Sequence, residues 1–285
     1  MFSQEGEETS APLPARIRLS HAYFQRLANL NAIDLLHVKG YAFGEEVYRP
    51  GRYSTDVDLL VRPAHISRFL YLLEQEGWRS LTSFESGSIF EHATTLYHPS
   101  WGLTDIHLYF PGLSLKNHEA AFSRLWDQKR TKEVAHFSCF VPSLVDCRNI
   151  VVIHGARSSA QVHPDVQYLQ EQLSRAEWDE MRRRIIEFDA EIAFDAALGQ
   201  VERHSSHPDY LVWKTMQNTQ VTPLQWWARI KRAEGIRSKL RIIMQIIFVN
   251  EDHLAMQLGH KPSAQEIRES FFKRFERISW WRKNK

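Results

Sequence analysis

The chain has 285 residues, of which 43% are hydrophobic and 25% are charged, and its net charge is +2. These proportions are ordinary for a folded globular protein and exclude the collagen-like, low-complexity and disordered classes. No apolar run is long enough to span a bilayer, no signal peptide is recognisable, and the two cysteines fit neither a disulfide framework nor a zinc site. We therefore expect a protein of the reducing cytoplasm.

The first part of the chain alternates helical and strand patterns. Residues 1–15 are polar and contain proline, so we expect a loose tail. The elements expected after it are, in chain order, a helix at 20–30, a strand at 34–38, a short helix at 41–48, a strand at 56–61, a helix at 64–75, strands at 79–84, 89–98 and 103–110, a helix at 119–126 and a strand at 133–141. The pattern predicts an α+β fold with a mixed sheet flanked by helices.

From residue 143 the pattern is helical nearly to the end of the chain. Apolar residues recur there at steps of three and four, as in Trp178, Met181, Ile185, Phe188 and Ile192. We therefore place a boundary near Pro142. The sequence predicts a catalytic domain over residues 16–142 and a helical domain over residues 143–285.

The C-terminal region is basic. From Pro223 to Lys285 there are 14 Lys and Arg against 6 Asp and Glu, or +8, whereas residues 1–222 carry 22 against 28, or −6. Aromatic residues are interleaved with the basic ones, a composition that suits contact with RNA or with a membrane surface. Packing of an amphipathic C-terminal helix explains the same spacing and is favoured.

Three aspartates form the strongest candidate for chemistry. Asp56 and Asp58 begin the strand at 56–61 and share one of its faces, because side chains two apart in a strand point the same way. Asp105 lies near the start of the strand at 103–110. If the two strands are neighbours, the three carboxylates meet at one rim, which is the ligand set of a two-metal phosphoryl-transfer site. The alternative is that these are strand-edge aspartates that only suppress aggregation.

Several residues close to the aspartates are candidates for binding a nucleotide. Lys39 and Gly40 follow a buried strand and precede a short helix, where backbone N–H groups can approach a phosphate. The planar guanidinium of Arg52 can donate two hydrogen bonds to phosphate oxygens. Ser54 and Thr55 can either bind phosphate or shape the turn, and the sequence does not decide between these roles.

His107 lies two residues after Asp105 and therefore faces the same side of the strand. We consider it a candidate for contacting substrate or orienting a carboxylate. A packed or surface histidine is the alternative.

Residues in the first half of the chain resemble a known family. The residues that carry the resemblance are Lys39-Gly40, Tyr48, Arg52 and Asp56–Val61. They resemble the "KG … Y … R … DIDLLV" signature of the uncharacterised bacterial nucleotidyltransferase family, which belongs to the DNA polymerase beta-like superfamily. Residues 104–107 are similar to that family's "DLH" strand, and His154 and Asp165 resemble a looser pattern in its helical half.

The resemblance implies a minimal nucleotidyltransferase sheet in which Asp56, Asp58 and Asp105 hold Mg²⁺, with Mn²⁺ as a second candidate. It also implies a nucleoside triphosphate, with ATP as the first candidate, whose phosphates lie near Gly40 with Lys39 and Arg52 close by. One departure concerns the Gly-Ser pair of the wider superfamily. Here Tyr41 follows Gly40, so the serine contact to phosphate is missing.

The reaction implied is transfer of a nucleoside monophosphate from the triphosphate to an acceptor hydroxyl, with release of pyrophosphate. The acceptor is a small molecule, a peptide or protein, or an RNA, and the sequence does not choose among them. Two other hypotheses are a non-catalytic nucleotide-binding or partner-binding protein on the same scaffold, and a nucleic-acid-binding protein that uses the basic C-terminal region.

Overall fold

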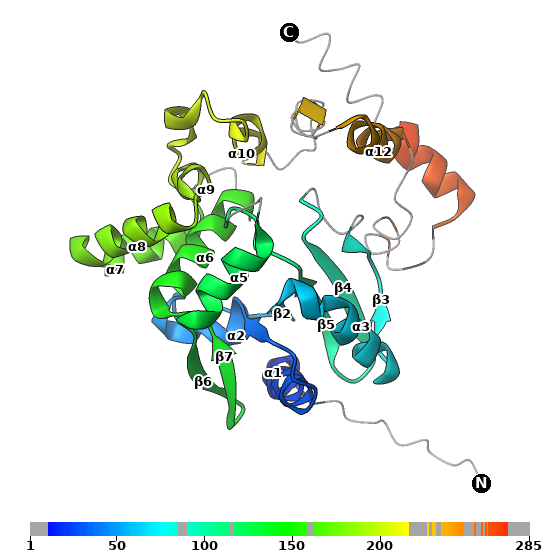
Figure 1. Ribbon diagram of the computed structural model, residues 1–285. Helices are drawn as coiled ribbons and strands as arrows, with labels where there is room; N and C mark the ends of the chain where they lie inside the picture. The colour runs from blue at the N-terminus through cyan, green and yellow to red at the C-terminus, as the bar shows by residue number, and fades with distance from the viewer. Residues whose placement is uncertain are drawn as a thin grey trace.

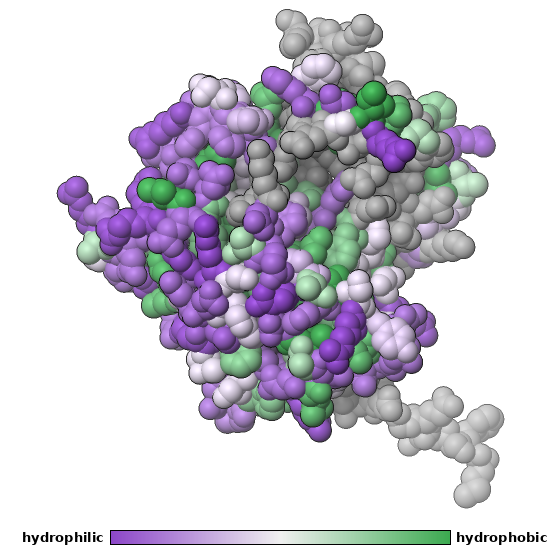
Figure 2. All heavy atoms as spheres, in the orientation of Figure 1, coloured by the Kyte–Doolittle hydropathy of each residue, from purple (hydrophilic) through white to green (hydrophobic). Residues whose placement is uncertain are grey.

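The computed structural model describes residues 11–84, 90–113, 117–158, 162–216, 235–247 and 262–272, together with isolated positions at 227, 230, 231, 254, 258 and 260. In Figure 1 the helices α5 to α10 gather on the left, the strands β3, β4 and β5 stand on the right, and β2 lies between them. The face drawn in Figure 2 is predominantly hydrophilic, with hydrophobic residues exposed in small areas. Among the described residues, buried apolar side chains such as Phe24, Phe43 and Trp213 form the core.

A five-stranded mixed sheet organises the first part of the chain. Its strands are β1 (Leu35–His37), β2 (Asp56–Val61), β3 (Arg79–Ser80), β4 (Ala93–His98) and β5 (Gly102–His107). The order across the sheet is β1-β2-β5-β4-β3. β2 and β5 run parallel, and the other neighbours are antiparallel. The predicted α+β class with a mixed sheet is therefore confirmed.

Helices cover both faces of this sheet. The helices of the first part are α1 (Leu13–Leu30), the four-residue α2 (Gly40–Phe43) and α3 (Ile66–Gln75), with 3-10 turns at Gly44–Glu46 and Pro63–His65. One buried cluster joins Phe24 of α1 and Phe69 of α3 to Val57, Leu59 and Ile106 of the central strands. This is the face on which the alternation of β2 places its apolar residues.

A second buried cluster joins the opposite face of the sheet to the helical part. Its helices are α5 (His118–Asp127), α6 (Leu144–Ser158), α7 (Pro164–Gln172), α8 (Arg175–Glu187), α9 (Glu191–Ala197) and α10 (Tyr210–Met216), followed by α12 (Gly235–Ile247). The cluster runs without a break from Leu36 and Leu60 of the sheet to Ile150 and Trp213 of the helices. The apolar core thus crosses the boundary placed at Pro142, and the division into two domains remains a prediction.

The strand expected at 133–141 is wrong, because the structure has a hairpin there. β6 (Arg130–Val134) and β7 (Phe137–Val141) pair antiparallel through a two-residue turn. Both turn residues, Ala135 and His136, have positive φ angles of 50° and 59°. Tight hairpin turns of this kind usually contain Gly or Asn, so the sequence lacked the signal that would have marked the turn.

Other boundaries also differ from those expected, among them those of the strands expected at 89–98 and 103–110, which begin at Ala93 and end at His107 respectively. The first helix begins at Leu13 and not at Ser20, so it includes the end of the segment expected to be a loose tail; Pro14 lies in its first turn, where a missing N–H costs nothing. The helix expected at 41–48 is divided into α2 and a 3-10 turn. Of the strand expected at 79–84, only Arg79–Ser80 forms.

The interpretation of the C-terminal region as a site for RNA or membrane falls mostly outside the described residues, which include none of 273–285. Within the described part of the chain, no helix combines the length and the apolar character needed to cross a membrane.

Candidate active site

The parallel pairing of β2 and β5 brings the candidate carboxylates together. Asp58 is directly opposite Asp105 in the register, and Leu60 is opposite His107. Because side chains alternate along each strand, Asp56, Asp58, Asp105 and His107 lie on one face of the sheet. From the sequence, the carboxylates were expected to meet only if the two strands were neighbours. The structure shows that the strands are neighbours.

Asp58 is the most enclosed of the three aspartates, with 5% of its surface exposed. Its Oδ1 atom lies 2.6 Å from the Nζ atom of Lys39 and 2.8 Å from the Nε2 atom of His107. Burial alone would raise the pKa of Asp58, but the Lys39 charge and the His107 hydrogen bond outweigh it and hold that pKa well below its ordinary value. Asp58 is therefore ionised throughout the physiological range.

Asp105 is oriented by the next strand. The Thr95 hydroxyl on β4 donates a hydrogen bond of 2.7 Å to Oδ1 of Asp105, since the two residues are paired in the antiparallel register. Asp58, Asp105 and His107 each offer one ligand atom, and these atoms lie within 4.8 Å of one another. A cation of ordinary radius can contact all three donors at such separations.

The pKa of Asp56 is raised by its burial and by the two neighbouring aspartates. Burial, and then the charges of Asp58 and Asp105, raise the pKa of Asp56 to about 7. Lys39 opposes the rise without cancelling it. Without a bound cation, the site therefore holds more negative charge than its own residues neutralise, and Asp56 keeps a proton up to near-neutral pH.

The chain turns sharply between β1 and β2 at Lys39 and Gly40, which have φ angles of 67° and 56°. Ser54 fills the space beside this turn. Its hydroxyl, in a residue only 8% exposed, donates a hydrogen bond of 2.9 Å to the carbonyl oxygen of Asp56. Ser54 thus supports the turn before β2, while Thr55 is exposed, and phosphate binding by either residue remains a prediction.

Replacing Gly40 with Ala should destabilise the protein by about 1–3 kcal/mol, because the new Cβ would lie 2.7 Å from Ser54 Oγ in a backbone conformation that favours glycine. Adding Ser54→Ala removes the closest atom and should recover part of the loss. The measurement is urea unfolding of the two single variants and the double variant. Additive free energies of unfolding would contradict this account of the contact.

Arg52 has a partner that the sequence did not reveal. Its Nε donates a hydrogen bond of 2.8 Å to Oδ2 of Asp165 at the start of α7, and its guanidinium lies 4.0 Å from the centre of the Tyr48 ring. Asp165 is 2% exposed, and the Nε atom of Arg49 lies 3.6 Å from its other oxygen. Arg52 thus connects the loop before β2 to the helical part, and a phosphate could meet only its remaining N–H groups.

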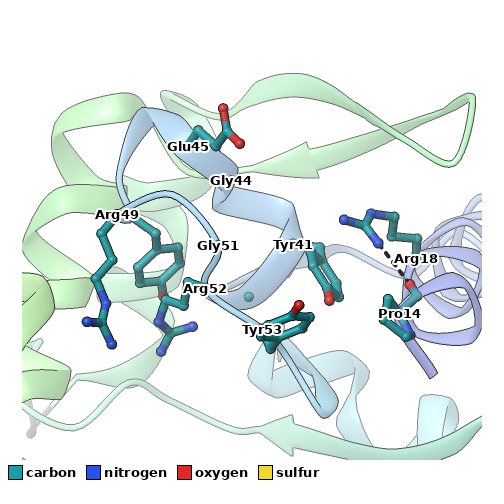
Figure 3. A pocket seen from close by; sticks show the side chains of 11 residues that line it. Pro14, Arg18, Tyr41, Gly44, Glu45, Arg49, Gly51, Arg52 and Tyr53 are labelled. Carbon is teal, nitrogen blue, oxygen red and sulfur yellow. Dashed lines mark hydrogen bonds between the residues drawn. The ribbon is translucent and has the colours of Figure 1, made fainter.

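Two adjoining cavities open on the side of this loop. The first, of about 300 Å³, is lined by Gly40, Tyr41, Tyr53, Arg18 and Arg52 among others. Figure 3 shows Tyr41 and Tyr53 pointing toward each other across it, while the guanidinium groups of Arg49 and Arg52 lie side by side at the far end. The aspartates do not line this cavity, but Gly40 in its wall is the neighbour of Lys39, which pairs with Asp58.

The second cavity, of about 500 Å³, shares Arg49, Arg52 and Tyr53 with the first and extends to His163 and Asp165 at the start of α7. One buried carboxylate here faces two guanidinium groups, so the walls carry a surplus of positive charge that suits an anionic ligand. None of Arg49, Tyr53 and Arg18 was singled out from the sequence, because a single exposed basic or aromatic residue carries no motif.

The helical part contributes His154 of α6 to the side of the site near Lys39. Burial, and then the charge of Lys39, hold the pKa of His154 well below 6.5, so its imidazole is neutral. Its Nδ1 atom lies 3.3 Å from the Ser158 hydroxyl. The residue is thus a partly buried histidine with a polar neighbour.

The site as a whole consists of carboxylates on adjacent parallel strands, with a lysine and an arginine-lined cavity at one side.

No protein-family model and no curated protein matches the sequence. Among solved structures, the chain is similar to the lincosamide antibiotic adenylyltransferase LnuA in its lincomycin-bound form, at 15% identity over 46% of this chain and 81% of that chain, with a TM-score of 0.32.

Two other solved structures are similar to the chain. The antibiotic-resistance factor ANT(2'')-Ia is 12% identical over 67% of this chain and 93% of its own, with a TM-score of 0.35. An antigenic nucleotidyltransferase-like protein from Paracoccidioides brasiliensis is 15% identical over 73% of this chain and 95% of its own, with a TM-score of 0.34. At these TM-scores we draw no functional conclusion from the similarities, and the proposal below depends on the geometry of the site.

Proposed function

We propose that the protein is a Mg²⁺-dependent nucleotidyltransferase that moves a nucleoside monophosphate from a nucleoside triphosphate to an acceptor hydroxyl. The observation that carries the proposal is the side-by-side placement of Asp58 and Asp105 on parallel strands, with Asp56 on the same face. A structural role for three clustered carboxylates is unfavourable, because like charges this close repel one another.

The donor set fits a hard divalent cation. Asp56, Asp58 and Asp105 would hold Mg²⁺ through carboxylate oxygens, and the raised pKa of Asp56 indicates the negative charge that such an ion would balance. The ligand atoms that lie within 4.8 Å of one another are those of Asp58, Asp105 and His107, and Asp56 is not in this group. The imidazole nitrogen of His107 would suit Mn²⁺ as well. When bound, the ion would neutralise charge on the phosphates and lower the pKa of the attacking hydroxyl.

The two adjoining cavities suit the phosphates of the nucleotide. Lys39 supplies a charge next to Asp58, and Arg52 and Arg49 supply guanidinium groups in the cavity walls. Gly40 lines the first cavity and follows Lys39 in the chain, so a triphosphate that bridges the cavity and the carboxylates would lie beside its backbone. Since α2 has only four residues, side-chain charge contributes more to anion binding here than any helix terminus does.

In the proposed reaction the acceptor hydroxyl oxygen attacks the α-phosphorus, and the bond from that phosphorus to the bridging oxygen of pyrophosphate breaks. Asp105 takes the hydroxyl proton, with its carboxylate held in orientation by the Thr95 hydrogen bond. Asp58, fixed by Lys39 and His107, stays ionised and gives the site a constant charge. Pyrophosphate leaves toward the arginine-lined cavity.

The proposal is tested by incubating the purified protein with cell extract, Mg²⁺ and each nucleoside triphosphate labelled at the α-phosphorus. We expect one fraction of the extract to gain label, and the parallel reaction with γ-labelled nucleotide to leave that fraction unlabelled. Transfer of the γ-label would indicate a kinase reaction, and absence of transfer from every triphosphate would contradict a nucleotidyltransferase.

A second candidate is a non-catalytic nucleotide-binding protein on the same scaffold. It is favoured by one observation: the Lys39 ammonium lies 2.6 Å from Asp58 Oδ1 and can neutralise that carboxylate without a metal. This candidate predicts that nucleotide binds with unchanged affinity after chelation of divalent cations and that no label is transferred.

A further inference from the structure

A partly buried arginine from the helical part interacts electrostatically with Asp58 and is not used by the mechanism above. Arg157 lies in the last turn of α6, with its guanidinium carbon 5.1 Å from the centre of the Phe110 ring and 5.9 Å from that of Phe90. Its Nη1 atom lies 3.2 Å from Nε2 of His92. The two aromatic rings and the imidazole fix the plane of the guanidinium.

Among the described residues, this guanidinium has no acidic partner. No carboxylate of these residues lies within 4.0 Å of Arg157, and its buried Nε atom has no hydrogen-bond partner. The buried Arg184 shows the usual arrangement: its Nε donates to Asp146 at 2.7 Å and a second N–H donates to the same carboxylate at 3.1 Å. Leaving a partly buried cation without an anion is costly, so its persistence in a folded protein suggests that a ligand supplies the anion.

The surroundings of Arg157 point to where that anion would bind. Burial lowers the pKa of Arg157 to about 10, and Asp58 is the first charge that opposes the shift, so the guanidinium stays protonated at neutral pH and lies within electrostatic reach of Asp58. Asp58 itself is already engaged by Lys39 and His107. The site therefore has the positive charge of Arg157 on the α6 side and carboxylates on the sheet side.

We propose that Arg157 binds a phosphate group of the nucleoside triphosphate from the helical side of the site, opposite the three aspartates. This inference rests on the proposed function. The planar fork of arginine matches two phosphate oxygens, and a phosphate would satisfy the unpaired Nε–H. The helical part would then contribute a substrate-binding residue to a site whose carboxylates all come from the sheet.

The experiment measures binding of ATP and of inorganic tripolyphosphate by calorimetric titration to the full chain and to three variants. Arg157→Gln should weaken the binding of both ligands by about 10- to 100-fold, the range expected for losing hydrogen bonds between charged groups. Arg157→Lys keeps the charge and the buried stem but not the fork, so an intermediate loss is expected. Circular dichroism checks folding, and the Lys variant still tests the proposal if the Gln variant fails to fold.

Arg148→Gln is the matched control. Arg148 is on the same helix and is 13% exposed, but its guanidinium pairs with Glu177 at 3.0 Å, so this variant should bind both ligands within about twofold of the wild type. If the wild type binds ATP and both Arg157 variants bind it equally well, the assignment of Arg157 is wrong while the proposed function stands. If the wild type binds neither ligand, the proposed function fails and this inference fails with it.

Discussion

Replacing Asp58 with Asn is expected to lower Mg²⁺-dependent nucleotide transfer by at least about 10³-fold, because the variant loses a metal ligand and a fixed charge in one change. Asp58 is the best placed of the three aspartates for both roles, since it lies beside Asp105 in the register and keeps its charge through Lys39. The measurement is the initial rate of label transfer from α-labelled nucleotide to the labelled fraction found in extract.

The matched control is Asp179→Asn, which makes the same chemical change at an exposed position on α8 and should leave the rate unchanged. Asp58→Asn also deprives Lys39 of its ionic partner, so its far-ultraviolet circular dichroism spectrum must match that of the wild type before the rate is compared. A folded Asp58→Asn variant that keeps a tenth or more of the wild-type rate would rule out Asp58 as an essential ligand.

The metal-free protein is expected to lose stability as the pH rises from about 4 to about 7, through Asp56. The pKa of this carboxyl is about 7 in the folded protein and 3.8 as its ordinary value. Between these values the folded state holds a proton that the unfolded state has released, so the free energy of unfolding falls with rising pH. The full effect is roughly 2–4 kcal/mol, from about 1.4 kcal/mol per unit of pKa.

Asp56→Asn removes this titration and therefore isolates it from the other groups. We expect the variant to exceed the wild type in stability at about pH 8 and to differ little from it at about pH 4, as measured by urea unfolding in the presence of a chelator. Added Mg²⁺ should raise the stability of the wild type at the higher pH, because a ligand that binds only the folded state stabilises it. A wild type that is as stable as Asp56→Asn at both pH values would contradict the crowded-carboxylate account.

The central part of the site could be predicted because it depends on local rules. Alternation along a strand fixes which face Asp56 and Asp58 share, and the apolar residues that follow them, Leu59 to Val61, identify the strand itself. The pairing of β2 with β5 depends on the course of the whole sheet, so the sequence could state the convergence of Asp58 and Asp105 only as a condition. Turn signals mark most elements, and the hairpin at Ala135 and His136 was missed because it lacks them.

The contacts between the sheet and the helices could not be predicted, because they join residues far apart in the sequence. Arg52 and Asp165 are 113 positions apart, and nothing in the pattern of either segment indicates the other. Arg157 looks like one more basic residue near a helix end until the structure shows its partly buried guanidinium without an acidic partner among the described residues. The charged neighbours and the burial of such a residue are set only when the chain folds.

The most direct test of the site is a titration of the metal-free protein with Mn²⁺, in the wild type and in the Asp58→Asn and Asp105→Asn variants. The concentration of free Mn²⁺ is measured by electron paramagnetic resonance. We expect the wild type to bind Mn²⁺, to bind it more tightly when ATP is present, and to lose at least about 10-fold in affinity with either substitution. Equal Mn²⁺ binding by the wild type and both variants would show that these aspartates do not form a metal site.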